Sequence, residues 1–330
     1  MAGFRQAPRP PVIRMALEGG PPASTQDKPA PDSALPASGF LLLTALTFFW
    51  GGNWPAMKIV LGELAVWPFR TICLIGGGLG LLAIARFGGL PLTVPQRDLR
   101  PLLICTLFNV VGWHLCSAYG ISLMQAGRAS IIAFTMPLWA ALLGHWVLGE
   151  RITAAKIVGL ALGLTGMAVL IGPDLQSLGA APLGALFMLG AAVSWATGTV
   201  AVKRFTWQIS TLVLTAWMLL LGAIPVAIGA LLIGEGLPAE GLSTQALLAL
   251  AYVLALPMLF YQWAYFSVVR LFPAVIAAIG TLAIPIVGVL SSAVVLGEPV
   301  GLRELIALCL VCGALAVVLV LPALREARKA

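Results

Sequence analysis

Ten apolar runs follow one another from residue 39 almost to the end of the chain, each long enough to cross a lipid bilayer. A helix needs about 20 predominantly apolar residues to span the hydrocarbon core. Such runs lie at 39–58, 68–87, 100–123, 128–148, 153–171, 182–203, 210–233, 245–268, 273–296 and 301–322. Only 9% of the residues are charged, against roughly 25% in a soluble domain, which excludes a soluble enzyme. The sequence predicts an all-α integral membrane protein with ten transmembrane helices.

The few Lys and Arg residues predict how these helices are oriented. With the N-terminus placed in the cytoplasm, fifteen of the 19 cationic residues fall on the cytoplasmic side, and only Lys58, Arg70, Arg128 and Arg303 fall on the other. Cytoplasmic loops of membrane proteins are enriched in Lys and Arg. We therefore expect a multi-pass protein of the inner (plasma) membrane with both termini in the cytoplasm.

Two terminal segments lie outside the spans. Residues 1–38 hold eight prolines and scattered charges, a composition that buries too little apolar surface to offset the entropy lost on ordering. We expect a disordered cytoplasmic tail at 1–38 and a short cytoplasmic tail at 323–330. Either Met1 or Met15 could be the start of translation.

The two halves of the chain resemble each other. FTMPLWAALLGHWVLGERIT (134–153) aligns with LAIPIVGVLSSAVVLGEPVG (282–301) at an offset of 148 residues, which places Pro137 on Pro285 and Glu150 on Glu298. A second match, at an offset of 145, pairs Trp50 with Trp195 and Lys58 with Lys203. Each repeat has five spans, an odd number, so the second copy enters the membrane upside down. We expect two inverted five-helix repeats, at 39–171 and 182–322, around a central cavity with the substrate near the bilayer midplane.

Ten spans in two repeats, each with a proline-centred helix followed by Leu-Gly-Glu and another helix rich in small residues, resemble the EamA-type drug/metabolite transporter superfamily. The resemblance covers residues 39–322. The aromatic first span and the tail-plus-ten-helix layout look closest to the YddG-like amino-acid exporters. The resemblance implies a membrane transporter that exports small metabolites, often amino acids, and that is not an enzyme.

Polar residues in the middle of spans point to the transport pathway, because polar groups in hydrocarbon cost free energy unless they face a cavity or a partner. Asn53 lies within FFWGGNWP, where Pro55 cannot donate the usual helical hydrogen bond and frees a carbonyl. Asn109 and Trp113 share one face of the third span, and His114, about 140° away at ~100° per residue, could bind a carboxylate or carry a proton. Tight packing of small residues and helix–helix hydrogen bonds are the alternatives for these positions.

Aromatic side chains deep in the spans are candidates for the cavity wall. An amphipathic ligand such as a neutral or aromatic amino acid suits walls of rings with occasional amides and hydroxyls. The candidate substrate-binding residues are Trp50, Asn53, Trp54, Asn109, Trp113, His114, Phe134, Trp195, Tyr261 and Tyr265. Hinging is expected at Pro55, Pro137 and Pro285. For any single aromatic residue, lipid-facing packing is the alternative.

No Asp or Glu falls in the middle third of any predicted span. A proton-driven antiporter needs an intramembrane carboxylate relay, so we expect an uncoupled facilitator that works by alternating access. Two alternatives stay open: an exporter of drugs or other small solutes, proton-coupled through His114, and, more remotely, a membrane-embedded enzyme. The expected partners are the lipid bilayer and a small-molecule substrate, with no nucleic acid, cofactor or metal, and the chain is expected to act as a monomer.

Overall fold

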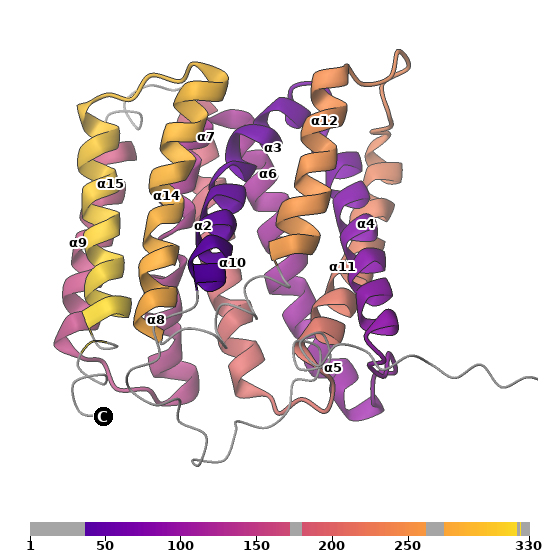
Figure 1. Ribbon diagram of the computed structural model, residues 1–330, viewed down its shortest axis with the longest axis horizontal. Coiled ribbons are helices and arrows are strands. Elements are labelled where there is room, and N and C mark those ends of the chain that lie inside the picture. Colours follow the sequence, from indigo (N-terminus) through magenta and orange to yellow (C-terminus); the bar gives the residue numbers. More distant parts are fainter. Residues whose placement is uncertain (1–36, 172–179, 262–273, 322–323, 325–330) are drawn as a thin grey trace, which may run out of the picture.

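The computed structural model describes residues 37–171, 180–261, 274–321 and 324, and every regular element in these ranges is helical (Figure 1). The helices form a single bundle of ten crossings. The first half consists of α2 (Ala37–Gly51) with α3 (Asn53–Leu61), α4 (Val66–Phe87), α5 (Gln96–Cys105) with the π-helix η1 (Thr106–Gly112) and α6 (Trp113–Leu123), α7 (Ala126–Ala133) with α8 (Met136–Leu148), and α9 (Ala154–Ile171).

The second half has the same order. It consists of α10 (Ala180–Arg204), α11 (Thr211–Ile233), α12 (Thr244–Val253) with the π-helix η3 (Leu254–Phe260), α14 (Ala274–Leu296), and α15 (Leu302–Leu315) with the π-helix η4 (Ala316–Val320). The N-terminal tail predicted at 1–38 and the C-terminal tail predicted at 323–330 lie almost wholly outside the described residues.

Length and apolar composition confirm a membrane protein. Among the described residues, six helical stretches are long and apolar enough to cross a bilayer: Val66–Phe87, Gln96–Leu123, Ala126–Leu148, Pro182–Arg204, Thr211–Ile233 and Leu302–Val320. Three shorter apolar helices accompany them. The predicted all-helical membrane protein is thus confirmed, and the ten helical crossings agree with the predicted spans to within a few residues at most ends.

The helix boundaries repeat at the offset that the sequence alignment gives. Adding 148 to the bounds of α5 gives those of α12, and adding 148 to the bounds of η1 gives those of η3. The same shift carries the first residue of α7 to that of α14, and the first residue of α9 to that of α15. Because η1 and η3 coincide, the duplication extends to the backbone hydrogen-bond pattern of the third and eighth crossings, whereas the π-helix η4 of the tenth crossing corresponds to an α-helical part of α9.

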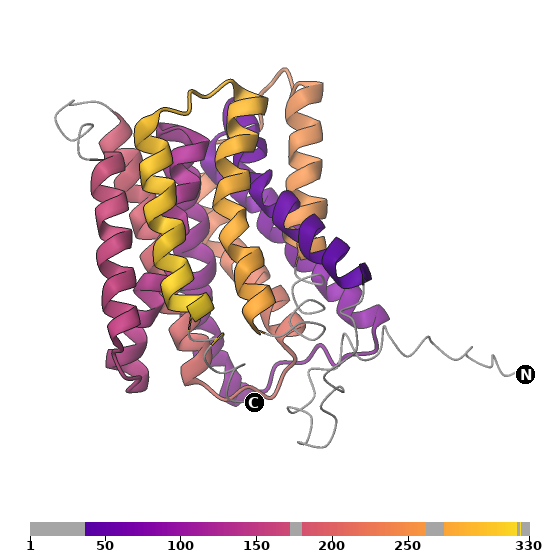
Figure 2. The same cartoon turned by 60° about the vertical axis from the view of Figure 1, so that its left-hand side comes forward.

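The connecting loops lie on two opposite edges of the bundle. Figures 1 and 2 place the loops 62–65, 234–243 and 297–301 on one edge, called here the upper edge, and the loops 88–95, 149–153 and 205–210 on the lower edge. The first described helix starts towards the lower edge and the last one ends there. Repeat-equivalent helices, such as α4 and α11, therefore run in opposite directions.

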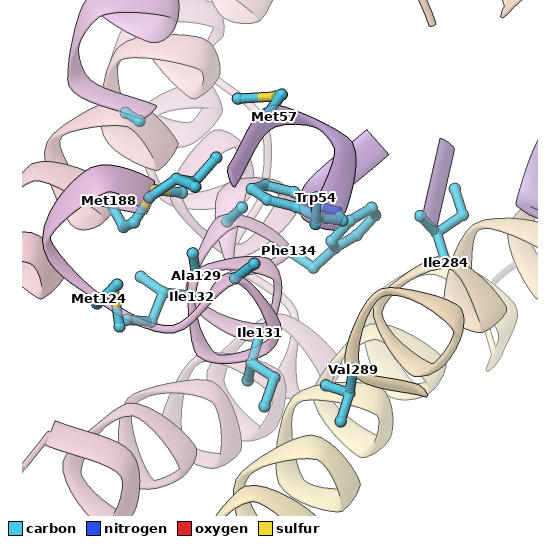
Figure 3. Close-up of a cluster of buried hydrophobic side chains, with 14 of the residues drawn as sticks. Trp54, Met57, Met124, Ala129, Ile131, Ile132, Phe134, Met188, Ile284 and Val289 are labelled. Carbon is cyan, nitrogen blue, oxygen red and sulfur yellow. The ribbon is translucent and has the colours of Figure 1, made fainter. Parts of the chain in front are cut away.

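The fourth crossing is more deeply buried in its upper half than in its lower half. Seven of the eight residues of α7, in the upper half of the fourth crossing, are buried, whereas α8, in the lower half, buries only Leu138 and Gly144. Figure 3 shows Trp54 and Phe134 next to each other in this upper core, with Ile284 of α14 nearby. The exposed fractions of Trp54 and Phe134 are 2% and 4%. The upper half of the fourth crossing is thus part of the packed core.

Candidate functional site

Four crossings are irregular near their middle. The first breaks at Gly52, between α2 and α3, and the fourth breaks between α7 and α8 at residues 134–135. The third and eighth instead contain the π-helices η1 and η3. Such segments alter the hydrogen-bond register and recur at functional sites, and irregular backbone at membrane depth is tolerated only inside protein or along a cavity. These four crossings define the candidate substrate site.

Prolines explain part of this irregularity. Pro55 cannot donate a hydrogen bond to the carbonyl of Gly51, and that carbonyl instead accepts one from Ser291 Oγ of α14, at 3.3 Å. Pro137 stands at the start of α8, directly after the break in the fourth crossing. Pro285, its repeat equivalent, lies inside the continuous helix α14. Two of the three predicted hinge prolines therefore lie within three residues of a break, and the third lies in an unbroken helix.

Two aromatic pairs lie at this level, and they are repeat-equivalent. The rings of Trp50 and Tyr261 are 3.9 Å apart between centroids, and those of Trp113 and Trp195 are 5.0 Å apart. Trp50 corresponds to Trp195 at the offset of 145, and Trp113 corresponds to Tyr261 at the offset of 148. Each pair joins the first crossing of one half to the third crossing of the other. Tyr265 lies outside the described residues.

Several buried polar atoms have no hydrogen-bond partner within the described part of the chain. They are Asn53 Oδ1, Trp54 Nε1, Thr71 Oγ1, Thr106 Oγ1, Asn109 Oδ1 and His114 Nδ1. Burying a polar group without a hydrogen bond costs about 1–3 kcal/mol, so these atoms are the ones a polar ligand could satisfy. Four of the six belong to residues that the sequence singles out as substrate-binding.

The predicted polar face of the third crossing contacts α10. A Cβ on Gly198 of α10 would overlap the side chain of Asn109, and one on Gly190 would lie 3.8 Å from Cys116 Sγ. Trp113 meets Trp195 of the same helix. Asn109 and Trp113 therefore line the contact between the two halves of the chain, and helix packing accounts for part of their environment.

Arg70 is a residue that sequence reasoning placed at the outer end of the second span without a functional role. Its side chain is 1% exposed. Its Nε donates to the carbonyl of His114 at 2.8 Å, and its Nη2 donates to Ser117 Oγ at 2.9 Å. Both acceptors are neutral. The one feature that could have pointed to Arg70 is its position, because a cation lies here four residues inside a membrane helix that begins at Val66.

A carboxylate on the upper edge links the two halves and gives a prediction for pH dependence. Glu63 accepts hydrogen bonds from the backbone amide of Ser243 at 2.8 Å and from Ser243 Oγ at 2.5 Å. The side-chain hydrogen bond and then the backbone one lower the pKa of Glu63 below its ordinary value of 4.5. A depressed carboxyl pKa means that the contact stabilises the fold above pH 4.5 and is lost as the pH falls through the lowered pKa.

We expect hydrogen exchange at the amide of Ser243 to accelerate as the pH falls through the lowered pKa of Glu63, after correction for intrinsic exchange rates, and the amide to stay protected at neutral pH. Glu63→Gln removes this pH dependence. Glu240→Gln, an exposed carboxyl on the same loop, leaves it unchanged and is the matched control. Equal protection at pH 3 and pH 7 would show that the carboxylate does not hold this amide.

A membrane bundle of two like halves, with helices broken or π-helical at mid-depth, is the architecture of secondary transporters. The comparison with known sequences agrees: the chain belongs to the EamA-like transporter family, whose pattern matches twice, at residues 37–172 and 182–320. It is a multi-pass membrane transporter and not an enzyme.

Individual relatives are distant. The chain is 30% identical to the uncharacterized transporter YvbV of Bacillus subtilis over 82% of this chain and 88% of that protein. It is 32% identical to the aromatic amino acid exporter YddG of Ancylobacter novellus, over 43% of this chain and 50% of that protein. A crystal structure of a protein 25% identical in sequence superposes with a TM-score of 0.59, covering 85% of this chain and 96% of the other.

Proposed function

We propose that this transporter exports small metabolites, namely neutral or aromatic amino acids, by alternating access between two inverted five-helix halves. The observation that carries the proposal is the pair of repeat-equivalent aromatic contacts, Trp50 with Tyr261 and Trp113 with Trp195, at the level of the helix breaks. An aromatic or aliphatic side chain of the substrate would lie against these rings. Its amino and carboxylate groups would bond to the unpartnered polar atoms of Asn53, Asn109 and His114.

The orientation of the transporter in the membrane is inferred from its charges. The lower edge carries Arg86, Arg97, Arg151 and Lys203 among its cations, which makes it the cytoplasmic edge by the positive-inside rule. Both termini are then cytoplasmic, in the inner membrane. In the fourth crossing the upper half is more buried than the lower half, which agrees with a state that loads substrate from the cytoplasm. The likeness to an aromatic amino acid exporter agrees with this cargo.

The carboxylates support an uncoupled facilitator. Within the described crossings, the carboxylates lie in loops or within three residues of a helix end, as Asp98 and Glu304 do. Net export then runs down the gradient of the substrate, and a tenfold excess in the cytoplasm supplies about 1.4 kcal/mol. The second candidate, a proton-coupled exporter of drugs or other solutes, has one observation in its favour: His114 Nδ1 is buried without a partner among the described residues.

One experiment separates these candidates. Purified protein in liposomes is screened for uptake of labelled neutral and aromatic amino acids, with and without a pH gradient. We expect uptake that is saturable and changes less than about twofold with the gradient, since no group transfers a proton. His114→Gln is expected to lower affinity without altering the response to pH. Uptake that requires the gradient and loses that requirement in His114→Gln would establish coupling, and no amino-acid uptake at all would rule out the proposed cargo.

A further inference from the structure

The turn between α6 and α7, on the upper edge, is held from both sides by charged groups. Lys58, near the end of α3, donates from Nζ to the carbonyls of Ile121 at 2.7 Å, Ser122 at 3.1 Å and Met124 at 2.9 Å. These carbonyls end α6, where the helix leaves acceptors unpaired and carries partial negative charge. The ammonium therefore binds a site of matching charge.

The other side of this turn is held by a carboxylate from the second half of the chain. Glu298, in the loop between α14 and α15, accepts hydrogen bonds from the amides of Ala126 at 2.7 Å and Gly127 at 2.9 Å. These are the first two residues of α7, where amides are unpaired and the helix carries partial positive charge. Lys58 and Glu298 together form what we call the upper latch, because they tie the first crossing and the α14–α15 loop to the third and fourth crossings.

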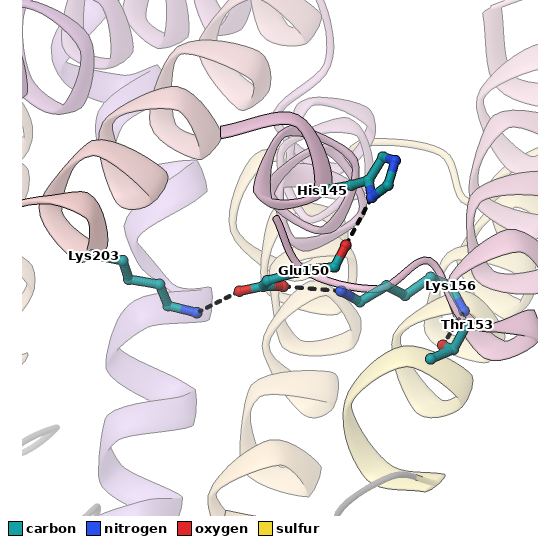
Figure 4. A network of polar contacts seen from close by, with 5 residues as sticks. All are labelled: His145, Glu150, Thr153, Lys156 and Lys203. Carbon is teal, nitrogen blue, oxygen red and sulfur yellow. Dashed lines mark hydrogen bonds and ion pairs between the residues drawn. The ribbon is translucent and has the colours of Figure 1, made fainter. Parts of the chain in front are cut away.

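The repeat equivalents of these two residues lie on the lower edge and contact each other. Lys203 corresponds to Lys58 and Glu150 corresponds to Glu298. Figure 4 shows Lys203 Nζ facing Glu150 Oε1, at 4.0 Å, and Lys156 Nζ at 2.9 Å from Glu150 Oε2. The same two residue types that bind helix ends on the upper edge thus form an ion pair on the lower edge.

The repeat also supplies a matching helix end for Glu150. The first residue of α7, Ala126, corresponds at the offset of 148 to Ala274, where the described part of α14 begins. A helix start offers unpaired amides whatever its side chains are, and by this repeat correspondence we assign to the amides of Ala274 and Val275 the role towards Glu150 that those of Ala126 and Gly127 have towards Glu298.

We propose, given the alternating access inferred above, that these charges form two latches that engage in turn. In the state described here, Glu298 holds the start of α7 and the upper edge is closed. In the opposite state, Glu150 leaves Lys156 and Lys203 and holds the start of α14, which closes the lower edge, while Glu298 releases α7. Lys58, Glu298, Lys203 and Glu150 are positioning residues of the transport cycle and do not touch the substrate.

This exchange balances the two states. Each state keeps one carboxylate on helix amides and leaves the other to a lysine, so the change of state replaces one set of charge-assisted hydrogen bonds by a like set. A facilitator needs such near-equality, because a large energy difference would trap it on one side. Removing one latch shifts the balance towards the other state, and removing both restores it.

The test measures the opening of the upper edge in the full-length protein. Spin labels are placed on cysteines introduced at Ser122 and Leu302, both exposed on the upper edge, in a background without the native cysteines. Distances are recorded in lipid nanodiscs. Glu298→Gln is expected to raise the ratio of long to short distances about tenfold, since charged hydrogen bonds are roughly twice as strong as neutral ones. Glu150→Gln is expected to lower the ratio by a similar factor.

The double variant Glu150→Gln with Glu298→Gln is decisive, because it is expected to return the ratio to within about threefold of the parent protein. A purely structural role for Glu298 would leave the double variant as shifted as the single one. Lys58→Gln should shift the ratio in the same direction as Glu298→Gln. It is the variant to use if the Glu298→Gln protein does not insert into the membrane. Glu240 is exposed on a neighbouring loop, and Glu240→Gln is the control that is expected to leave the ratio unchanged.

The proposal is overturned if both single variants shift the ratio in the same direction, if neither shifts it, or if the double variant keeps the shift of Glu298→Gln. Amino-acid uptake by the labelled parent protein is measured in parallel. No uptake would overturn the proposed cargo while the distances still test the latches, and normal uptake with unresponsive distances would overturn the latches alone.

Discussion

Replacing Trp195 by alanine is expected to lower the uptake rate of aromatic amino acids, measured at limiting substrate, by about ten- to a hundredfold. Trp195 lies with its ring 5.0 Å from that of Trp113, on the continuous helix α10, which packs against the π-helical third crossing. Removing the indole takes away one wall against which the side chain of the substrate would be buried, a contact worth about 1.5–3 kcal/mol. The repeat-equivalent change Trp50→Ala is expected to have a similar effect, because it opens the matching contact with Tyr261.

The control for this prediction is another tryptophan in the same bundle. Trp146, near the end of α8, is 69% exposed, and Trp146→Ala is expected to leave uptake unchanged. Thermal unfolding in detergent separates lost binding from lost fold, and Trp113→Phe, which keeps a ring, should keep most of the activity. Normal transport in Trp50→Ala, Trp113→Ala and Trp195→Ala together would show that the aromatic pairs do not line the pathway.

Hydropathy was sufficient to predict the number and limits of the crossings, since each must bury about 20 apolar residues in lipid. It could not predict their internal breaks. A π-helix such as η1 differs from an α-helix only in hydrogen-bond register, which side-chain polarity does not encode. The break at residues 134–135 has no glycine, and Pro285 causes no break in α14 although it aligns with Pro137. Tertiary packing decides which of two equivalent prolines bends its helix.

Part of the candidate site could also be predicted from the pattern of polar and apolar residues. Rare polar residues in apolar spans, such as Asn53 and Asn109, draw attention because burial makes them costly, and the structure leaves an oxygen of each unpartnered among the described residues. Arg70 escaped notice because a cation near a span end normally extends its charge to water. Its burial depends on acceptors contributed by the third crossing, His114 and Ser117, which are distant in sequence.

The contact between η1 and α10 gives the largest expected effect on stability. A Cβ on Gly198 would overlap the side chain of Asn109 and approach its backbone nitrogen to 2.8 Å. Backbone cannot move aside as a flexible side chain can, so Gly198→Ala must push α10 away from η1. Overpacking of this kind costs about 1–3 kcal/mol, and we expect a lowering of the apparent melting temperature by several degrees.

Gly190, two turns earlier on α10, is the matched control for this substitution. A Cβ there would meet only Cys116 Sγ, at the ordinary contact distance of 3.8 Å. Because alanine favours a helix over glycine by about 0.5–1 kcal/mol, Gly190→Ala should raise the melting temperature slightly or leave it unchanged. The two variants thus add the same methyl group to the same helix, with opposite expected changes in melting temperature.

If both destabilise the protein equally, glycine is needed along α10 for a reason other than its closeness to Asn109. If only Gly198→Ala does so and also weakens amino-acid uptake, the closeness of η1 to α10 serves both the fold and the site, since displacing α10 moves Trp195 away from Trp113.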